Sequence, residues 1–156
     1  MTRSRRLLVA VIACGVFAAG APAGADLAPW DQAKVTALAK QLADATQALN
    51  DTFYLQPPPG RGSMQSRSYQ QLRQKIRMIR MEAGALSASL AKGEGHEETL
   101  PSYESLMQMV RDARRDAQQV FSTVDVQQKA TAARLILNQI SPYYDADAMP
   151  LAPATR

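Results

Sequence analysis

The stretch YQQLRQKIRMIRMEAGALSASL, residues 69–90, decides the fold, because its apolar residues recur at alternating spacings of three and four. This spacing lines one face of an α-helix, whereas a half-buried strand would alternate every second residue. We therefore predict a helix over about residues 66–92 with one face in a core. The apolar ladder consists of Tyr69, Leu72, Ile76, Ile79, Ala83, Leu86 and Leu90.

Three further segments repeat this spacing between stretches rich in Gly, Pro and Ser. The alternation suits left-handed, near-antiparallel helix packing, and short connections favour neighbours that follow one another in the chain. The sequence thus predicts an all-α fold, an up-down-up-down antiparallel four-helix bundle over residues 26–142. The three ladders are Val35, Leu38, Leu42, Ala45 and Leu49; Tyr103, Leu106, Val110, Ala113, Ala117, Val120 and Val124; and Val126, Ala130, Ala133, Leu137 and Ile140.

Capping residues predict where these helices begin and end. Helix 1 is expected over about residues 29–55, since proline is tolerated in a first helical turn, and Pro101 is placed in the same way at the start of the third helix. Thr99 and Asp125 are candidate N-caps, while Gly93 and Pro142 are candidate stops.

The first 25 residues have the pattern of a secretory signal peptide. Arginines at positions 3, 5 and 6 precede an apolar run over residues 7–19, and small residues follow up to Ala25. The run is shorter than the roughly 20 residues of a bilayer span. We expect cleavage after Ala25, a mature chain that begins at Asp26, and export to the periplasm.

Cys14 supports a second interpretation of the same segment. Val11-Ile12-Ala13-Cys14 has the form of a lipobox, in which the cysteine is acylated and becomes the new N-terminus. A protein anchored through Cys14 is therefore the alternative, and lipidation is the one route by which we expect membrane attachment. Otherwise the cysteine only fills the apolar run.

The charge of the mature chain argues against nucleic acid as a partner. Of the 18 Lys and Arg residues, three lie in the signal segment, which holds none of the 14 acidic residues, so the mature net charge is +1. Cys14 is the single cysteine, so removal of the segment would leave neither a disulfide nor a thiol nucleophile.

Enzymatic chemistry finds little support in the remaining residues. His96 is the only histidine and lies in the loop GEGHEE, and no serine has the surroundings of a nucleophile elbow. A carboxylate-bridged di-iron bundle needs two Glu-x-x-His motifs, which the sequence lacks. Glu94, His96, Glu97 and Glu98 resemble a solvated acidic loop more than a metal site. We predict no catalytic, metal or cofactor site.

Four residues of the second helix form a candidate partner surface: Arg77, Met78, Arg80 and Met81. In the heptad frame of the ladder, the two methionines occupy outward positions between arginines. Flexible thioethers suit adaptable binding surfaces, so another protein or an acidic lipid surface would fit. The simpler alternative is a helix surface that tolerates methionine, and thioether binding of Cu(I) is a third.

Together these patterns predict an exported, non-enzymatic interaction or structural protein of the bacterial cell envelope, whose partner is another envelope protein. The alternative is a carrier that holds a small apolar ligand or cofactor between the helices, since alanines in the ladders either allow close packing or line a cavity. Residues 143–156 are expected to be a flexible tail.

Overall fold

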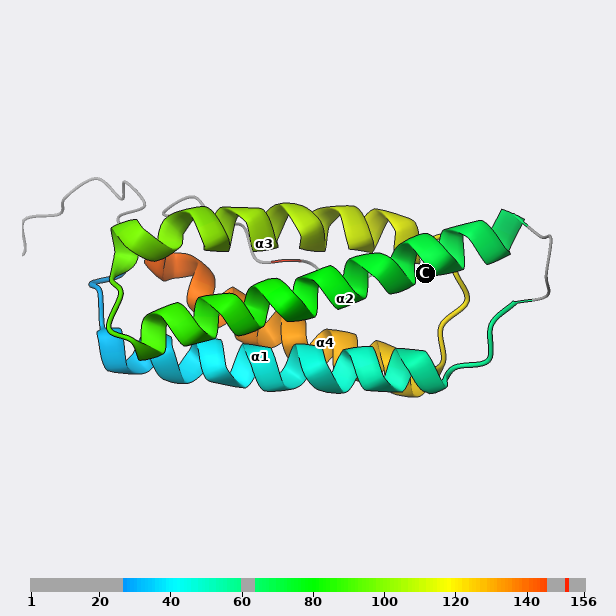
Figure 1. Ribbon diagram of the computed structural model, residues 1–156, viewed down its shortest axis with the longest axis horizontal. Coiled ribbons are helices and arrows are strands. Elements are labelled where there is room, and N and C mark those ends of the chain that lie inside the picture. Colours follow the sequence, from blue (N-terminus) through cyan, green and yellow to red (C-terminus); the bar gives the residue numbers. More distant parts are fainter. Residues whose placement is uncertain (1–26, 60–63, 146–150, 152–156) are drawn as a thin grey trace, which may run out of the picture.

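The computed structural model describes residues 27–59, 64–145 and 151, and within them it is all-helical, with no strand. Figure 1 shows the helices lying side by side along the long axis, and their packing is compatible with a four-helix bundle. The elements are α1 (Gln32–Leu55), α2 (Met64–Ala91), α3 (His96–Ala117), α4 (Val124–Ile140) and the short 3₁₀-helix η1 (Ser141–Tyr143).

Polar caps fix the starts of three helices, at positions that differ from those predicted. The Asp31 side chain accepts a hydrogen bond from the Lys34 backbone N–H, so α1 begins at Gln32 rather than near residue 29. Thr123, not Asp125, caps α4. Gly95, not Thr99, precedes α3, whose first turn is held by a bond of 2.9 Å from the Gly95 N–H to Glu98 Oε2.

The early start of α3 also moves Pro101 into its second turn, instead of the predicted first turn. Gly93 ends α2 as expected, because its φ of 90° lies in the left-handed region that favours glycine.

The core is built from the predicted ladders. All seven ladder positions of α2 are buried, from Tyr69 to Leu90, because a strict three-four alternation keeps one stripe facing the same neighbours. The other buried ladder residues are Val35, Leu38, Leu42, Tyr103, Leu106, Ala113, Val120, Val126, Ala133, Leu137 and Ile140.

Three predicted ladder residues are exposed instead of buried: Ala117, Val124 and Ala130. The helix α3 ends at Ala117, and the chain turns before Thr123, so the continuous ladder assumed through Val124 is broken there. Val120 still reaches the core from the turn, whereas Val124 begins the next helix on its outer side.

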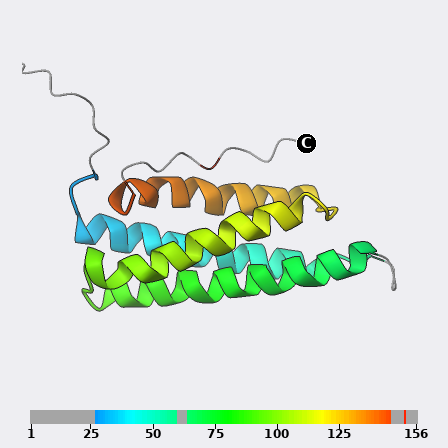
Figure 2. The same ribbon diagram turned by 90° about the horizontal axis from the view of Figure 1, so that it is seen from above.

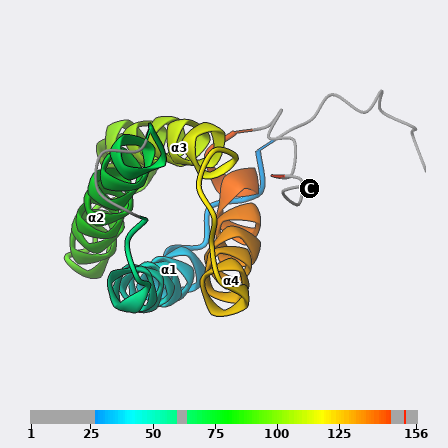
Figure 3. The ribbon, with the colours of Figure 1, turned by 90° about the vertical axis from the view of Figure 1, so that its right-hand side faces the viewer.

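Figure 3 shows the helices arranged as a ring, and Figure 2 shows α3 running at an angle to the other helices. Close packing joins α1 to α2, α1 to α4, and α2 to α3, whereas α3 and α4 are not among the extensively packed pairs although they follow one another in the chain. Among the described helices, α3 and α4 are therefore the least closely packed pair of chain neighbours.

The packed domain continues past the predicted boundary at residue 142. Tyr143 and Tyr144, assigned above to a flexible tail, are buried, and the Pro142 carbonyl accepts a bond of 2.8 Å from the Ala28 N–H. The described residues therefore pack against the helices as far as Tyr144. The predicted signal segment, Cys14 and the cleavage point at Ala25 lie outside the described residues, as does the tail apart from residues 143–145 and 151.

Candidate functional site

The four predicted partner residues, which we call the α2 strip, lie on the outer side of α2. Met78 and Met81 are 44% and 57% exposed, and Arg77 is exposed as well. Arg80 is half-buried, because its guanidinium donates a bond of 3.0 Å to Gln47 Oε1 on α1. The strip therefore presents two exposed thioethers and the exposed guanidinium of Arg77, while Arg80 contacts α1.

The helix that carries this strip is strongly basic. It holds five cations and a single carboxylate, Glu82, which gives a net charge of +4. Lys75 forms an ion pair of 2.7 Å with Asp116 on α3, and the Arg73 guanidinium lies 3.8 Å from the centre of the Tyr54 ring. These two contacts join α2 to its neighbours α3 and α1. The five cations are Arg67, Arg73, Lys75, Arg77 and Arg80.

The methionines are divided between two kinds of surface. Met107 and Met109 of α3 are half-buried against the core, whereas Met78 and Met81 face outward from α2. Among the described residues, no group of three or more His, Cys, Asp or Glu side chains is placed to hold a metal ion.

His96 is not the loop residue that the sequence suggested. It is the first residue of α3, and its ring stacks on Tyr144 at a centroid distance of 5.4 Å and meets Trp30 edge-on at 5.5 Å. Its Nδ1 lies 3.1 Å from Glu97 Oε1. Tyr103 stacks on Tyr144 at a centroid distance of 4.3 Å. We call Trp30, His96, Tyr103, Tyr143 and Tyr144 the aromatic end cluster.

Hydrogen bonds hold the two buried hydroxyls of this cluster. Tyr103 donates to Ser141 Oγ at 3.0 Å, and the Tyr144 hydroxyl is 2.8 Å from Thr99 Oγ1. Burial raises the pKa of both Tyr103 and Tyr144, although the hydrogen bond of each tyrosine opposes that shift. The two phenols thus pack in their neutral form, and the cluster closes one end of the helical domain.

Sequence reasoning did not anticipate this cluster, because its members come from three separate segments. The only local signal was the pair Tyr143-Tyr144 after the last helix. Phe53, which lies outside this cluster, is buried in the core and stacks on Tyr69 at a centroid distance of 5.0 Å.

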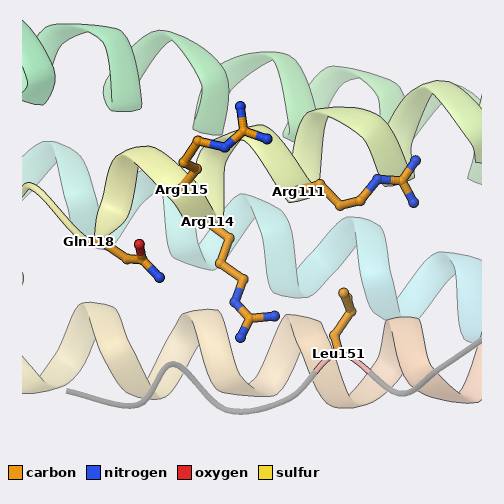
Figure 4. Close-up of a pocket in the computed structure, with 5 residues that line it drawn as sticks. All are labelled: Arg111, Arg114, Arg115, Gln118 and Leu151. Atoms are coloured by element: carbon orange, nitrogen blue, oxygen red, sulfur yellow. The ribbon is translucent and has the colours of Figure 1, made fainter.

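A shallow hollow lies between α3 and Leu151. It encloses about 330 Å³ and is open to solvent. We call it the α3 hollow, and Figure 4 shows its lining by three arginines from two successive turns of α3, one amide and one leucine. The lining residues are Arg111, Arg114, Arg115, Gln118 and Leu151.

The opposite end of the domain exposes large apolar side chains. Leu55 is 86% exposed and Phe121 is 75% exposed. Their backbones are held near one another by Gln56, whose amide donates to the Phe121 carbonyl at 2.8 Å and accepts from the Thr123 N–H at 3.2 Å.

Comparisons with models of known protein families, with curated proteins and with solved structures find no match for this chain. In the described part of the chain, no helix is both long enough and apolar enough to cross a membrane.

Proposed function

We propose that the protein is an exported, non-enzymatic interaction protein of the bacterial cell envelope, and that the α2 strip is the surface by which it binds another envelope protein. The observation that carries this proposal is the exposure of Met78 and Met81 on a helix whose inward ladder is completely buried. Two adaptable apolar side chains beside Arg77 and Arg80 provide contact area together with charge.

The charge of α2 supports a partner with an acidic surface. A net charge of +4 on one helix favours encounter with a complementary potential, which contributes to association rate and orientation more than to affinity. The exposed apolar area on Met78 and Met81 would then contribute to slow dissociation, since buried apolar side chains are the usual source of binding energy.

The architecture in this proposal is the antiparallel, up-down-up-down bundle. Its support is the colour gradient in Figure 1, which reverses from each helix to the next, and the short connections between them. Export is supported by the arginines and the apolar run of residues 1–25, which have the order of a signal peptide.

A double substitution tests the strip: M78E/M81E, compared with V124E/L135E as the matched control. Val124 and Leu135 are exposed apolar residues of α4, at 67% and 53%, so the control adds the same charge to another surface. Each purified variant is immobilised and exposed to envelope extract, and captured proteins are identified by mass spectrometry. We expect M78E/M81E to lose a partner that the parent chain and the control both retain.

Thermal unfolding of the same variants separates the outcomes. A free surface should change the free energy of unfolding by within about 0.5 kcal/mol. A loss of several kcal/mol would show instead that Met78 and Met81 are covered, for example by a second subunit, because a charge would then enter an apolar contact. Capture by M78E/M81E equal to that of the parent would refute the strip as the binding surface.

A further inference from the structure

The α3 hollow is lined by Arg114, an arginine that pairs with no other described residue. The Arg114 side chain extends from α3 toward α4 in Figure 4, and it is half-buried. No ion pair or hydrogen bond joins its guanidinium to any other residue that the structure describes. The guanidinium is therefore available to an anion, which it would bind through charge-assisted hydrogen bonds.

The neighbouring arginines are only weakly engaged. Arg111 donates a bond of 3.2 Å to the neutral amide of Gln108, and the nearest atoms of Arg115 and Asp112 are 3.9 Å apart. The adjacent carboxylate of Asp116 is paired with Lys75 on α2, away from the hollow. The hollow therefore has three guanidinium groups and no closely paired carboxylate among the described residues.

The helix dipole accounts for only part of this arrangement. Cations near a helix C-terminus are favourable, but the effect decays within the last turn. Arg114 and Arg115 lie in that turn of α3, whereas Arg111 lies a full turn earlier. Compensation of the helix dipole does not explain why these cations border a hollow that is also lined by an apolar side chain, Leu151.

We propose that the α3 hollow binds a phosphoryl group of an anionic ligand, independently of the α2 strip. Guanidinium groups present forked donors that match phosphate oxygens in pairs, and all three cations here are arginine rather than lysine. Gln118 adds an amide donor, and Leu151 offers an apolar contact for the body that carries the phosphate. The phosphate of a lipid headgroup and a free phosphate share this chemistry.

The three guanidinium groups do not converge in Figure 4, where the Arg111 and Arg115 side chains run along α3 and only Arg114 extends toward α4. Both side chains are exposed and lie one turn apart, so rotation about their side-chain bonds would bring them to one ligand. That ordering costs conformational entropy. Weak binding of one phosphate and stronger binding of two linked phosphates are therefore expected.

The test is calorimetric titration of the purified chain with inorganic phosphate and with pyrophosphate, and sedimentation with phosphatidylglycerol or phosphatidylcholine vesicles. The variant is R111Q/R114Q, and the matched control is K92Q/K129Q, which removes two exposed cations that lie outside both the hollow and the α2 strip. We expect R111Q/R114Q to weaken binding at least about tenfold, since each lost bond is charge-assisted, while the control changes it little.

The two sources give distinct results, and both support the site. Binding of pyrophosphate in solution shows that a free phosphate suffices, whereas binding only to phosphatidylglycerol vesicles assigns the ligand to a lipid headgroup. Equal weakening in R111Q/R114Q and K92Q/K129Q would overturn the proposal, because only net charge would then matter. Failure of every probe to bind the parent chain would overturn it as well. Unchanged melting of both variants confirms that they fold.

Discussion

Replacing Tyr144 by alanine tests whether the turn after α4 is an integral part of the folded domain. Tyr144 is buried, stacks on Tyr103 and His96, and meets Trp30 edge-on at 5.4 Å. Its hydroxyl also bonds to Thr99. Alanine would remove the ring from the centre of the aromatic end cluster and leave a cavity bounded by three other rings.

The expected cost follows from these contacts. Truncation of a buried aromatic side chain to alanine costs about 3–5 kcal/mol, a sum of lost burial and residual cavity. Tyr144→Phe should cost only about 0.5–1.5 kcal/mol, because the ring stays and Thr99 Oγ1 keeps its bond of 2.6 Å to the Gly95 carbonyl. In a domain of this size, the alanine variant should melt roughly 10–20 °C lower than the parent.

Urea and thermal unfolding, followed by circular dichroism, measure both variants. Tyr54→Ala is the matched control, since Tyr54 is 47% exposed and has only the contact with Arg73 to lose. Its cost should stay near 1 kcal/mol or below. If Tyr144→Ala melted within a degree or two of the parent, the inference that residues 143 and 144 belong to the core would be refuted.

Two further predictions concern pH and processing. Because burial raises the pKa of Tyr103 and Tyr144 in the folded state, their contribution to stability is complete below the unfolded-state value of about 10 and is lost as the pH rises through the folded-state values. Melting temperature should therefore fall above about pH 10, less steeply in Y103F/Y144F, and equal slopes would contradict this. Intact mass measurement of the natural N-terminus should give a chain that begins at Asp26 without lipid, and an acylated Cys14 would establish the anchored alternative.

The sequence was sufficient for the helices and for most of their inward faces. The α2 ladder needs no tertiary information, because a three-four repeat over seven positions leaves only one face that can be buried. The outward placement of Met78 and Met81 follows from the same register, and their exposure agrees with it. Helix starts were predicted less well, since Gly95 and Thr123 compete with Thr99 and Asp125 as neighbouring candidates for the cap.

Tertiary structure alone decided the two features that no ladder encodes. His96 lies between Trp30 and Tyr144 because both ends of the domain's chain return to the start of α3, and ring stacking between distant segments has no local periodicity. Arg114 faces a hollow because α3 and α4 do not pack closely, and the spacing between helices depends on all the side chains at their contacts. A sequence specifies which face of each helix is apolar, but the fit of those faces in three dimensions determines which polar side chains are left without partners.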